Sequence, residues 1–222
     1  MDPTLATKKP VSMARRLWGS VRIVAGLLVL VALVTQIIDK TIHHAIVPSQ
    51  YFMYFSIQSS FLNVAVLLIG GVLALRSTID GEFFSSIQMA ILVYAIITAL
   101  VYNTLLRGIP LAPGTPPGLQ WPIEVMHVWI PIVILADWLF APGRARLAWA
   151  SLRLLVTYPL VWALVTIVRG LLSGWYPYPF LEPSHPGGWF SVLGYVLGIA
   201  VLVIGLGSAA IALSRRPAKL SS

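Results

Sequence analysis

Long apolar stretches alternate with short polar segments along most of the 222-residue chain. Three of these stretches, at positions 51–75, 83–106 and 186–214, contain no Asp, Glu, Lys or Arg. Each is longer than the roughly 20 residues that a helix needs to cross a membrane. Three further stretches of similar length carry a few polar residues, at about 17–38, 120–140 and 147–172. The pattern predicts an all-α membrane protein, a six-transmembrane-helix bundle.

We expect the six helices to form a single transmembrane domain over residues 17–213. A flexible cytoplasmic arm at 1–16 precedes it, and a cytoplasmic tail at 214–222 follows it. The composition agrees, with 58% hydrophobic residues and a mean hydropathy of +0.88. The chain has no cysteine, which excludes disulfides, thiolate metal ligands and cysteine nucleophiles.

The basic residues are distributed unevenly between the two sides of the predicted bundle. With both termini inside, twelve of the fifteen Lys and Arg residues lie on that side, and only Lys40, Arg107 and Arg169 lie on the other. The positive-inside rule then predicts an N-in, C-in multi-pass protein of the cell membrane. This orientation and contact with the bilayer explain the net charge of +8, so we expect no nucleic-acid partner. The twelve are Lys8, Lys9, Arg15, Arg16, Arg22, Arg76, Arg144, Arg146, Arg153, Arg215, Arg216 and Lys219.

A polar stripe and a histidine interrupt two of the spans. His127 lies in the fourth span, where a purely structural helix would carry an aliphatic residue. Ionisable groups at membrane depth are costly and are functional-site hypotheses by default. The second span carries Ser56, Ser59, Ser60 and Asn63 at spacings of i, i+3, i+4 and i+7, which is one helical face. Both spans enter from the outward side, so a hydroxyl and an imidazole lie roughly 7–10 Å deep at 1.5 Å per residue.

A hydroxyl next to a base is the minimum apparatus of nucleophilic acyl transfer. His127 would take the proton from Ser56 as its oxygen attacks an ester carbonyl, and would then return the proton to the leaving alcohol. Ser59 or Ser60, on the same face, are alternative nucleophiles.

Further polar residues of the outward half would support this chemistry. Asn63, Asn103 or a backbone N–H would stabilise the oxyanion. Either Asp39 or Glu124 would hold the tautomer of the imidazole, and the sequence does not choose between them.

Two ion pairs are also expected. Arg169 pairs with Glu182 or binds a substrate carboxylate, and the ion pair is favoured because it needs no substrate. Asp137 lies about 15 Å from His127 along the helix and is expected to pair with Arg144 or Arg146 at the cytoplasmic side.

Three segments around these residues resemble a known family. They are Tyr54-Phe-Ser-Ile-Gln-Ser59, the His127 span ending in Leu135-Ala-Asp-Trp138, and Gly174-Trp-Tyr-Pro-Tyr-Pro-Phe-Leu-Glu182. They look like the androgen-induced six-transmembrane hydrolases, whose animal members hydrolyse fatty acid esters of hydroxy fatty acids with a threonine and a histidine. The resemblance covers roughly residues 20–210 in the number and order of helices.

The resemblance places the family histidine at His127 and the family threonine at Ser56. Serine keeps the hydroxyl and removes only a methyl group. The resemblance implies an integral-membrane hydrolase of lipid esters, with its site in the outward half of the bundle and no metal or cofactor.

Two other functions compete with this hypothesis. A metal-dependent membrane hydrolase would use the four histidines with nearby carboxylates, although no H-x-x-x-H spacing occurs. A lipid-binding or transport protein would use the outward polar cavity, but no internal repeat supports it. The proline-aromatic loop at 174–183 is either an interfacial anchor or a lid over that cavity. The histidines are His43, His44, His127 and His185, and the carboxylates are Asp39, Glu124 and Glu182.

Overall fold

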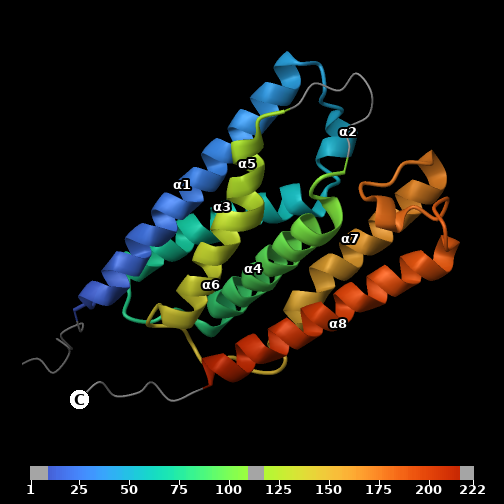
Figure 1. Ribbon diagram of the computed structural model, residues 1–222. Coiled ribbons are helices and arrows are strands. Elements are labelled where there is room, and N and C mark those ends of the chain that lie inside the picture. Colours follow the sequence, from blue (N-terminus) through green and yellow to red (C-terminus); the bar gives the residue numbers. More distant parts are fainter. Residues whose placement is uncertain (1–9, 110–117, 216–222) are drawn as a thin grey trace, which may run out of the picture.

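The computed structural model describes residues 10–109 and 118–215, which form helices joined by short loops (Figure 1). Within these ranges six helical segments are long and apolar enough to cross a membrane, as the sequence predicts. Two short elements lie between them, α2 (Pro48–Tyr51) and the 3-10 helix η3 (Pro179–Leu181). The six are α1 (Met13–Ile42); α3 (Phe55–Arg76); α4 (Glu82–Val101) with the π-helical η1 (Tyr102–Leu106); α5 (Gln120–Glu124), the π-helical η2 (Val125–Trp129) and α6 (Ile130–Phe140); α7 (Ser151–Ser173); and α8 (Gly188–Ser214).

The first helix begins at Met13, earlier than the predicted domain boundary at residue 17. Its N-cap is Ser12, whose hydroxyl accepts a hydrogen bond from the backbone N–H of Arg15 at 3.3 Å. Most of the predicted arm, residues 1–9, and of the predicted tail, residues 216–222, lie outside the described residues.

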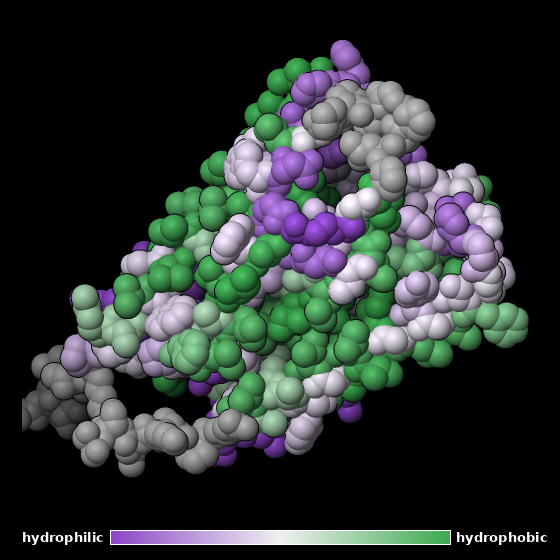
Figure 2. All heavy atoms as spheres, in the orientation of Figure 1, coloured by the Kyte–Doolittle hydropathy of each residue, from purple (hydrophilic) through white to green (hydrophobic). Residues whose placement is uncertain are grey.

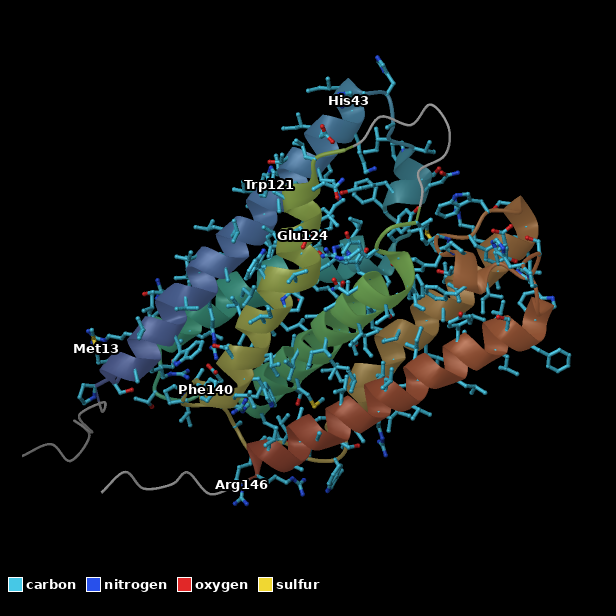
Figure 3. All side chains as sticks on the ribbon, in the orientation of Figure 1. Met13, His43, Trp121, Glu124, Phe140 and Arg146 are labelled. Atoms are coloured by element: carbon cyan, nitrogen blue, oxygen red, sulfur yellow. The ribbon has the colours of Figure 1, made fainter. Side chains whose placement is uncertain are left out.

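The connections between the spans alternate between two ends of the bundle. Met13, Phe140 and Arg146 lie toward one end, and His43 and Glu124 toward the other (Figure 3). We call the first the basic end and the second the distal end. Lys8, Lys9, Arg216 and Lys219 lie outside the described residues. The other eight basic residues assigned to the inner side belong to helices and loops of the basic end, whereas Lys40, Arg107 and Arg169 belong to the distal end.

The four helices α1, α3, α4 and α6 form a unit around a common core. α1 packs along α3 and also contacts α5, η2 and α6, while α4 contacts α3 and α6. As a result, α3 and α6 lie across this four-helix unit from each other. The hairpin of α7 and α8 packs on α4 beside the unit (Figure 1). Val29, Leu33, Met89 and Val93 are completely buried in the core.

The second span starts later than its apolar stretch predicts. A short helix ends at Tyr51, and α3 begins only at Phe55. Two side chains bind carbonyl groups of the residues between these two helices. Gln58 donates to Phe52 O at 2.8 Å, and Trp162 donates to Met53 O at 2.9 Å. Ser56 therefore lies in the first turn of α3 and not about five residues inside the helix.

Two spanning segments contain an internal proline, and α4 with η1 supplies hydrogen bonds in both places. A proline has no N–H for the carbonyl four residues earlier. Pro159 thus leaves Leu155 O free, and the Tyr94 hydroxyl donates to it at 2.7 Å. Pro131 leaves the carbonyl of His127 free in the same way. The side chain of Asn103 donates to that oxygen at 3.3 Å.

A network of buried charges joins three segments at the basic end. Arg15 donates to Asp80 at 2.6 Å and also to the carbonyl groups of Ser77 and Pro142. Arg22 donates to Asp137 at 2.8 Å and lies 3.6 Å from Asp80. The two arginines and Asp80 are at most 4% exposed, so each charge depends on its partners.

The predicted pairing of Asp137 with Arg144 or Arg146 is wrong. Asp137 instead bonds to Arg22, which reaches it from α1. Arg144 lies over the ring of Trp138, 3.9 Å from its centroid, and donates to the carbonyl of the same residue. Burial lowers the pKa of Arg144, and Asp137 nearby offsets part of this effect.

Candidate functional site

Buried polar side chains gather inside the distal half of the four-helix unit. Ser59, Ser60 and Asn63 of α3 are at most 3% exposed, and Thr98 of α4 and His127 of η2 are at most 8% exposed. They belong to three different helices that surround one core. On the outer surface, Figure 2 shows hydrophilic residues at the distal end around α5 and a largely apolar face below it.

His127 is held in its π-helical segment by contacts on both sides. Its ring lies against the ring of Tyr102, with the centroids 4.4 Å apart and the planes inclined by 36°. Tyr102 is itself the first residue of η1, so two π-helical segments bring the two rings together. Such π-helical turns occur frequently at functional sites.

A backbone carbonyl sets the tautomer of His127. Nδ1 of the imidazole lies 2.9 Å from the carbonyl oxygen of Ile123. A carbonyl oxygen can only accept a hydrogen bond, so in the neutral ring the proton is on Nδ1 and Nε2 carries the lone pair. Among the described residues Nε2 has no hydrogen-bond partner. The ring is therefore arranged to accept a proton at Nε2.

The two carboxylates expected to orient His127 have other partners. Glu124 receives two hydrogen bonds of 2.7 Å from Arg107. Asp39 accepts from the backbone N–H of Leu119 at 3.1 Å and lies 3.4 Å from Nδ1 of His43. Neither holds the imidazole, and the carbonyl of Ile123 takes that role.

The three candidate hydroxyls differ in their hydrogen bonds. Ser59 and Ser60 both donate to the carbonyl of Ser56, at 3.2 and 2.7 Å. Their protons are thereby engaged by the backbone of their own helix. In the described part of the chain, the Ser56 hydroxyl makes no bond of this kind. Of the three, Ser56 is the most available as a nucleophile.

Tyr178 is the recorded polar neighbour of Ser56. Its hydroxyl accepts the backbone N–H of Ser56 at 3.3 Å and so satisfies one of the free N–H groups at the start of α3. Burial raises the pKa of Tyr178 to about 12, although bonds with the side chain and backbone of Ser56 offset part of the rise.

Ser56 and His127 share no hydrogen bond or ring contact. Ser56 contacts Tyr178, whereas His127 contacts Ile123 and Tyr102, and their helices lie across the four-helix unit. The nucleophile–base pair stays a prediction.

Asn63 and Thr98 each carry a buried oxygen that lacks a hydrogen-bond partner among the described residues. Leaving a buried polar group unpaired costs about 1–3 kcal/mol, so a polar molecule that entered this interior would be stabilised there. Asn103 is engaged with the carbonyl oxygens of Ala99 and His127. An oxyanion needs a donor, which the unpaired oxygen of Asn63 is not; the preference for Asn63 over Asn103 rests on the amide N–H groups of Asn103 already being used.

Arg169 does not form the expected pair with Glu182. Its guanidinium lies over the ring of Trp175, 4.8 Å from the centroid. Glu182 accepts from Ser184 at 2.6 Å and lies 3.4 Å from His185. The role of Arg169 toward a substrate carboxylate is untested by these contacts.

Tyr178 and Tyr102 were missed as site residues by sequence reasoning. The loop at 174–183 was interpreted as an anchor or a lid, and in the structure it packs inward, with Tyr178 only 7% exposed. Its position in a proline-aromatic segment was the available signal. Tyr102 lies near the end of an apolar stretch, and nothing in the sequence links it to His127.

Apart from the chain neighbours His43 and His44, the histidines are separate from one another in the structure. His43 lies by Asp39, His185 by Glu182, and His127 by Ile123. Over residues 10–109 and 118–215, no three His, Cys, Asp or Glu side chains come together as metal ligands. Comparison of the chain with models of protein families, with curated proteins and with solved structures gives no significant match.

Proposed function

We propose that the protein is an integral-membrane hydrolase of lipid esters, such as fatty acid esters of hydroxy fatty acids. The observation that carries the proposal is the 2.9 Å contact of His127 Nδ1 with the carbonyl of Ile123. In the neutral ring this contact leaves Nε2 without a proton and able to act as a base at membrane depth. The Ser56 hydroxyl, which does not donate to the backbone of its own helix as Ser59 and Ser60 do, supports it further, as do the three segments similar to androgen-induced six-transmembrane hydrolases.

The reaction has two stages. Oγ of Ser56 attacks the ester carbonyl while its proton passes to Nε2 of His127, and the C–O bond to the alcohol breaks as that proton is returned to the leaving oxygen. Water then gives a proton to the same nitrogen and attacks the acyl-serine; the acyl C–Oγ bond breaks as that proton passes to Oγ of Ser56, and the fatty acid is released. Asn63 donates to the oxyanion in both stages.

The mechanism requires that substrate binding bring Ser56 and His127 together. Catalytic hydrogen bonds are often long in a free enzyme and shorten only in the complex. Ser56 lies in the first turn of its helix, beside the loop that carries Tyr178, so the movement toward His127 would begin in that turn and that loop.

A fluorophosphonate probe tests the proposal directly. We expect it to label the purified wild-type protein, and we expect Ser56→Ala and His127→Ala to abolish the labelling while thermal stability is retained. Ser20→Ala is the matched control, because Ser20 is another helix serine and lies at the basic end. It keeps full labelling.

Hydrolysis of a fatty acid ester of a hydroxy fatty acid is measured in parallel. Loss of labelling only in Ser59→Ala or Ser60→Ala would move the nucleophile one turn along α3. A wild-type protein that neither reacts with the probe nor hydrolyses the ester would refute the proposed function.

We also propose that the protein lies in the cell membrane with its distal end on the extracytoplasmic side. The support is the number of arginines at the basic end. The site would then open toward the outer leaflet.

A further inference from the structure

An apolar cleft of about 170 Å³ lies between α4, α7 and α8. Its walls include Tyr94 from α4, Pro159 and Trp162 from α7, and Ile199 and Ala200 from α8. Almost all of the atoms that line it are apolar. The cleft lies outside the polar interior, and none of Ser56, His127 and Asn63 lines it.

The polar atoms of its aromatic walls are bonded to the protein. The Tyr94 hydroxyl donates to Leu155 O, Trp162 Nε1 donates to Met53 O, and the Tyr178 hydroxyl bonds to Ser56 N. The aromatic residues therefore present carbon surfaces to the cleft. A ligand here gains by apolar burial and needs no hydrogen bond of its own.

The cleft opens on the membrane-spanning surface. Leu160 and Ile204, which line it, are 65% and 47% exposed. Along α8 the lining runs from Val196 to Ile204, which is about 12 Å at 1.5 Å per residue. This is close to the depth of one leaflet, since the hydrocarbon core is about 30 Å thick. A helix, about 10 Å wide, is too large for a cleft of this volume.

One end of the cleft is lined by two residues that adjoin the proposed nucleophile, although Ser56 itself does not line it. Phe55 and Tyr178 both line the cleft, and they are the chain neighbour and the hydrogen-bond partner of Ser56. A chain lying along α8 would thus have its distal end at Ser56.

We propose that the cleft binds a single acyl chain of a membrane lipid, with the polar end of that lipid at Ser56 and Tyr178. Binding of the acyl chain follows from the apolar walls of the cleft alone. Only the placement of the lipid's polar end at Ser56 rests on the proposed function.

Photocrosslinking in phosphatidylcholine nanodiscs tests the proposal. The probe is palmitic acid with a diazirine near its methyl end, and the protein carries Ser56→Ala so that catalysis does not interfere. We expect saturable crosslinks to Tyr94, Trp162 or Ile199, which an excess of unlabelled palmitic acid removes. Ala200→Phe fills the cleft and reduces these crosslinks by about tenfold, and the smaller Ala200→Leu gives an intermediate reduction.

The control is Ala209→Phe, an exposed position on the same helix that does not line the cleft. It leaves the crosslinks unchanged. Crosslinks that are spread over all lipid-facing helices without saturation, or that are insensitive to both Ala200 variants, would overturn the proposal. Saturable crosslinks in the cleft, together with a wild-type protein that hydrolyses no ester, would reject the proposed function and retain the acyl-chain site.

Discussion

The Ile123 carbonyl oxygen and the Tyr102 ring hold His127 without an ionised partner. A carboxylate at Nδ1 would stabilise the imidazolium strongly, as in serine proteases, whereas a neutral carbonyl does so less. The orientation of the ring is therefore independent of the ionisation of Asp39 and Glu124, which are bonded elsewhere. At the scale of single residues, neutral groups hold the proposed base, His127, and the carboxylates of Asp39 and Glu124 take no part in holding it.

Two buried tyrosines at the distal end make stability sensitive to alkaline pH. Burial raises the pKa of Tyr51 and of Tyr178 from 10.0 to about 12. The neutral forms are thus favoured in the folded state, and their contribution is complete below pH 10 and lost as the pH rises toward 12. A shift of this size corresponds to about 2–3 kcal/mol for each residue.

We expect the free energy of unfolding in detergent to fall between pH 10 and pH 12. The fall should be smaller in Tyr51→Phe and Tyr178→Phe, because phenylalanine does not titrate. Tyr195→Phe is the control, since Tyr195 is exposed. An equal alkaline loss of stability in all three variants would show that other groups are responsible.

α4 with η1 completes the hydrogen bonding of two neighbouring segments. Tyr94 bonds to the carbonyl that Pro159 leaves free, and Asn103 bonds to the one that Pro131 leaves free. At the scale of the elements, this explains why two prolines are tolerated inside apolar spans. The bond from Asn103 is to the carbonyl of His127 itself, in the π-helical segment η2. The irregular part of this span and the candidate site therefore coincide.

A double-mutant cycle tests the link between Tyr94 and Pro159. Tyr94→Phe should reduce stability by about 1–3 kcal/mol, because it leaves a buried carbonyl unpaired. In a Pro159→Ala background the loss should be much smaller, since alanine restores an N–H for Leu155 O. Thermal unfolding in detergent measures both losses.

Tyr51→Phe serves as the control for that cycle, because its hydroxyl bonds to Gln36 in another part of the bundle. Its cost should be the same with and without Pro159→Ala, as expected for distant sites. If Tyr94→Phe is equally costly in both backgrounds, its hydroxyl does not compensate for the proline.

The molecule as a whole is polarised between its ends. Eight arginines of the described residues belong to the basic end, against one lysine and two arginines at the distal end. The buried network of Arg15, Arg22, Asp80 and Asp137 balances two positive and two negative charges. The other arginines of this end give it a net positive charge, which would attract anionic headgroups.

Cysteine labelling tests the orientation, and the chain has no cysteine of its own. Ala45→Cys at the distal end should react with a membrane-impermeant maleimide on intact cells. Ala148→Cys at the basic end should react only after the cells are permeabilised. Both alanines are exposed, so they form a matched pair. The reverse pattern would invert the proposed topology.

The membrane spans could be predicted because hydropathy is a property of consecutive residues. Most contacts in the candidate site could not be predicted, because they join residues far apart in the sequence. Hydropathy alone located six helices, and it failed at the start of α3, where Gln58 and Trp162 bind carbonyl groups inside an apolar stretch. The sequence also singled out His127 and the polar face of α3; His127, Ser59, Ser60 and Asn63 are each buried, but the predicted contact between Ser56 and His127 stays a prediction. It could not name Ile123, Tyr102 or Tyr178 as their partners, since those contacts depend on π-helical geometry and on a returning loop.

The pairing of Arg22 with Asp137 has a consequence for how the chain is made. The two residues are separated by 115 positions, so α1 leaves the ribosome long before its counter-ion on α6 exists. An arginine inside a helix is costly in lipid, and a long side chain can avoid that cost by reaching for the headgroups. It follows that α1 first stays shallow, and that it reaches its final depth only when the later helices arrive. α1, which precedes the other described helices, is then among the last to settle.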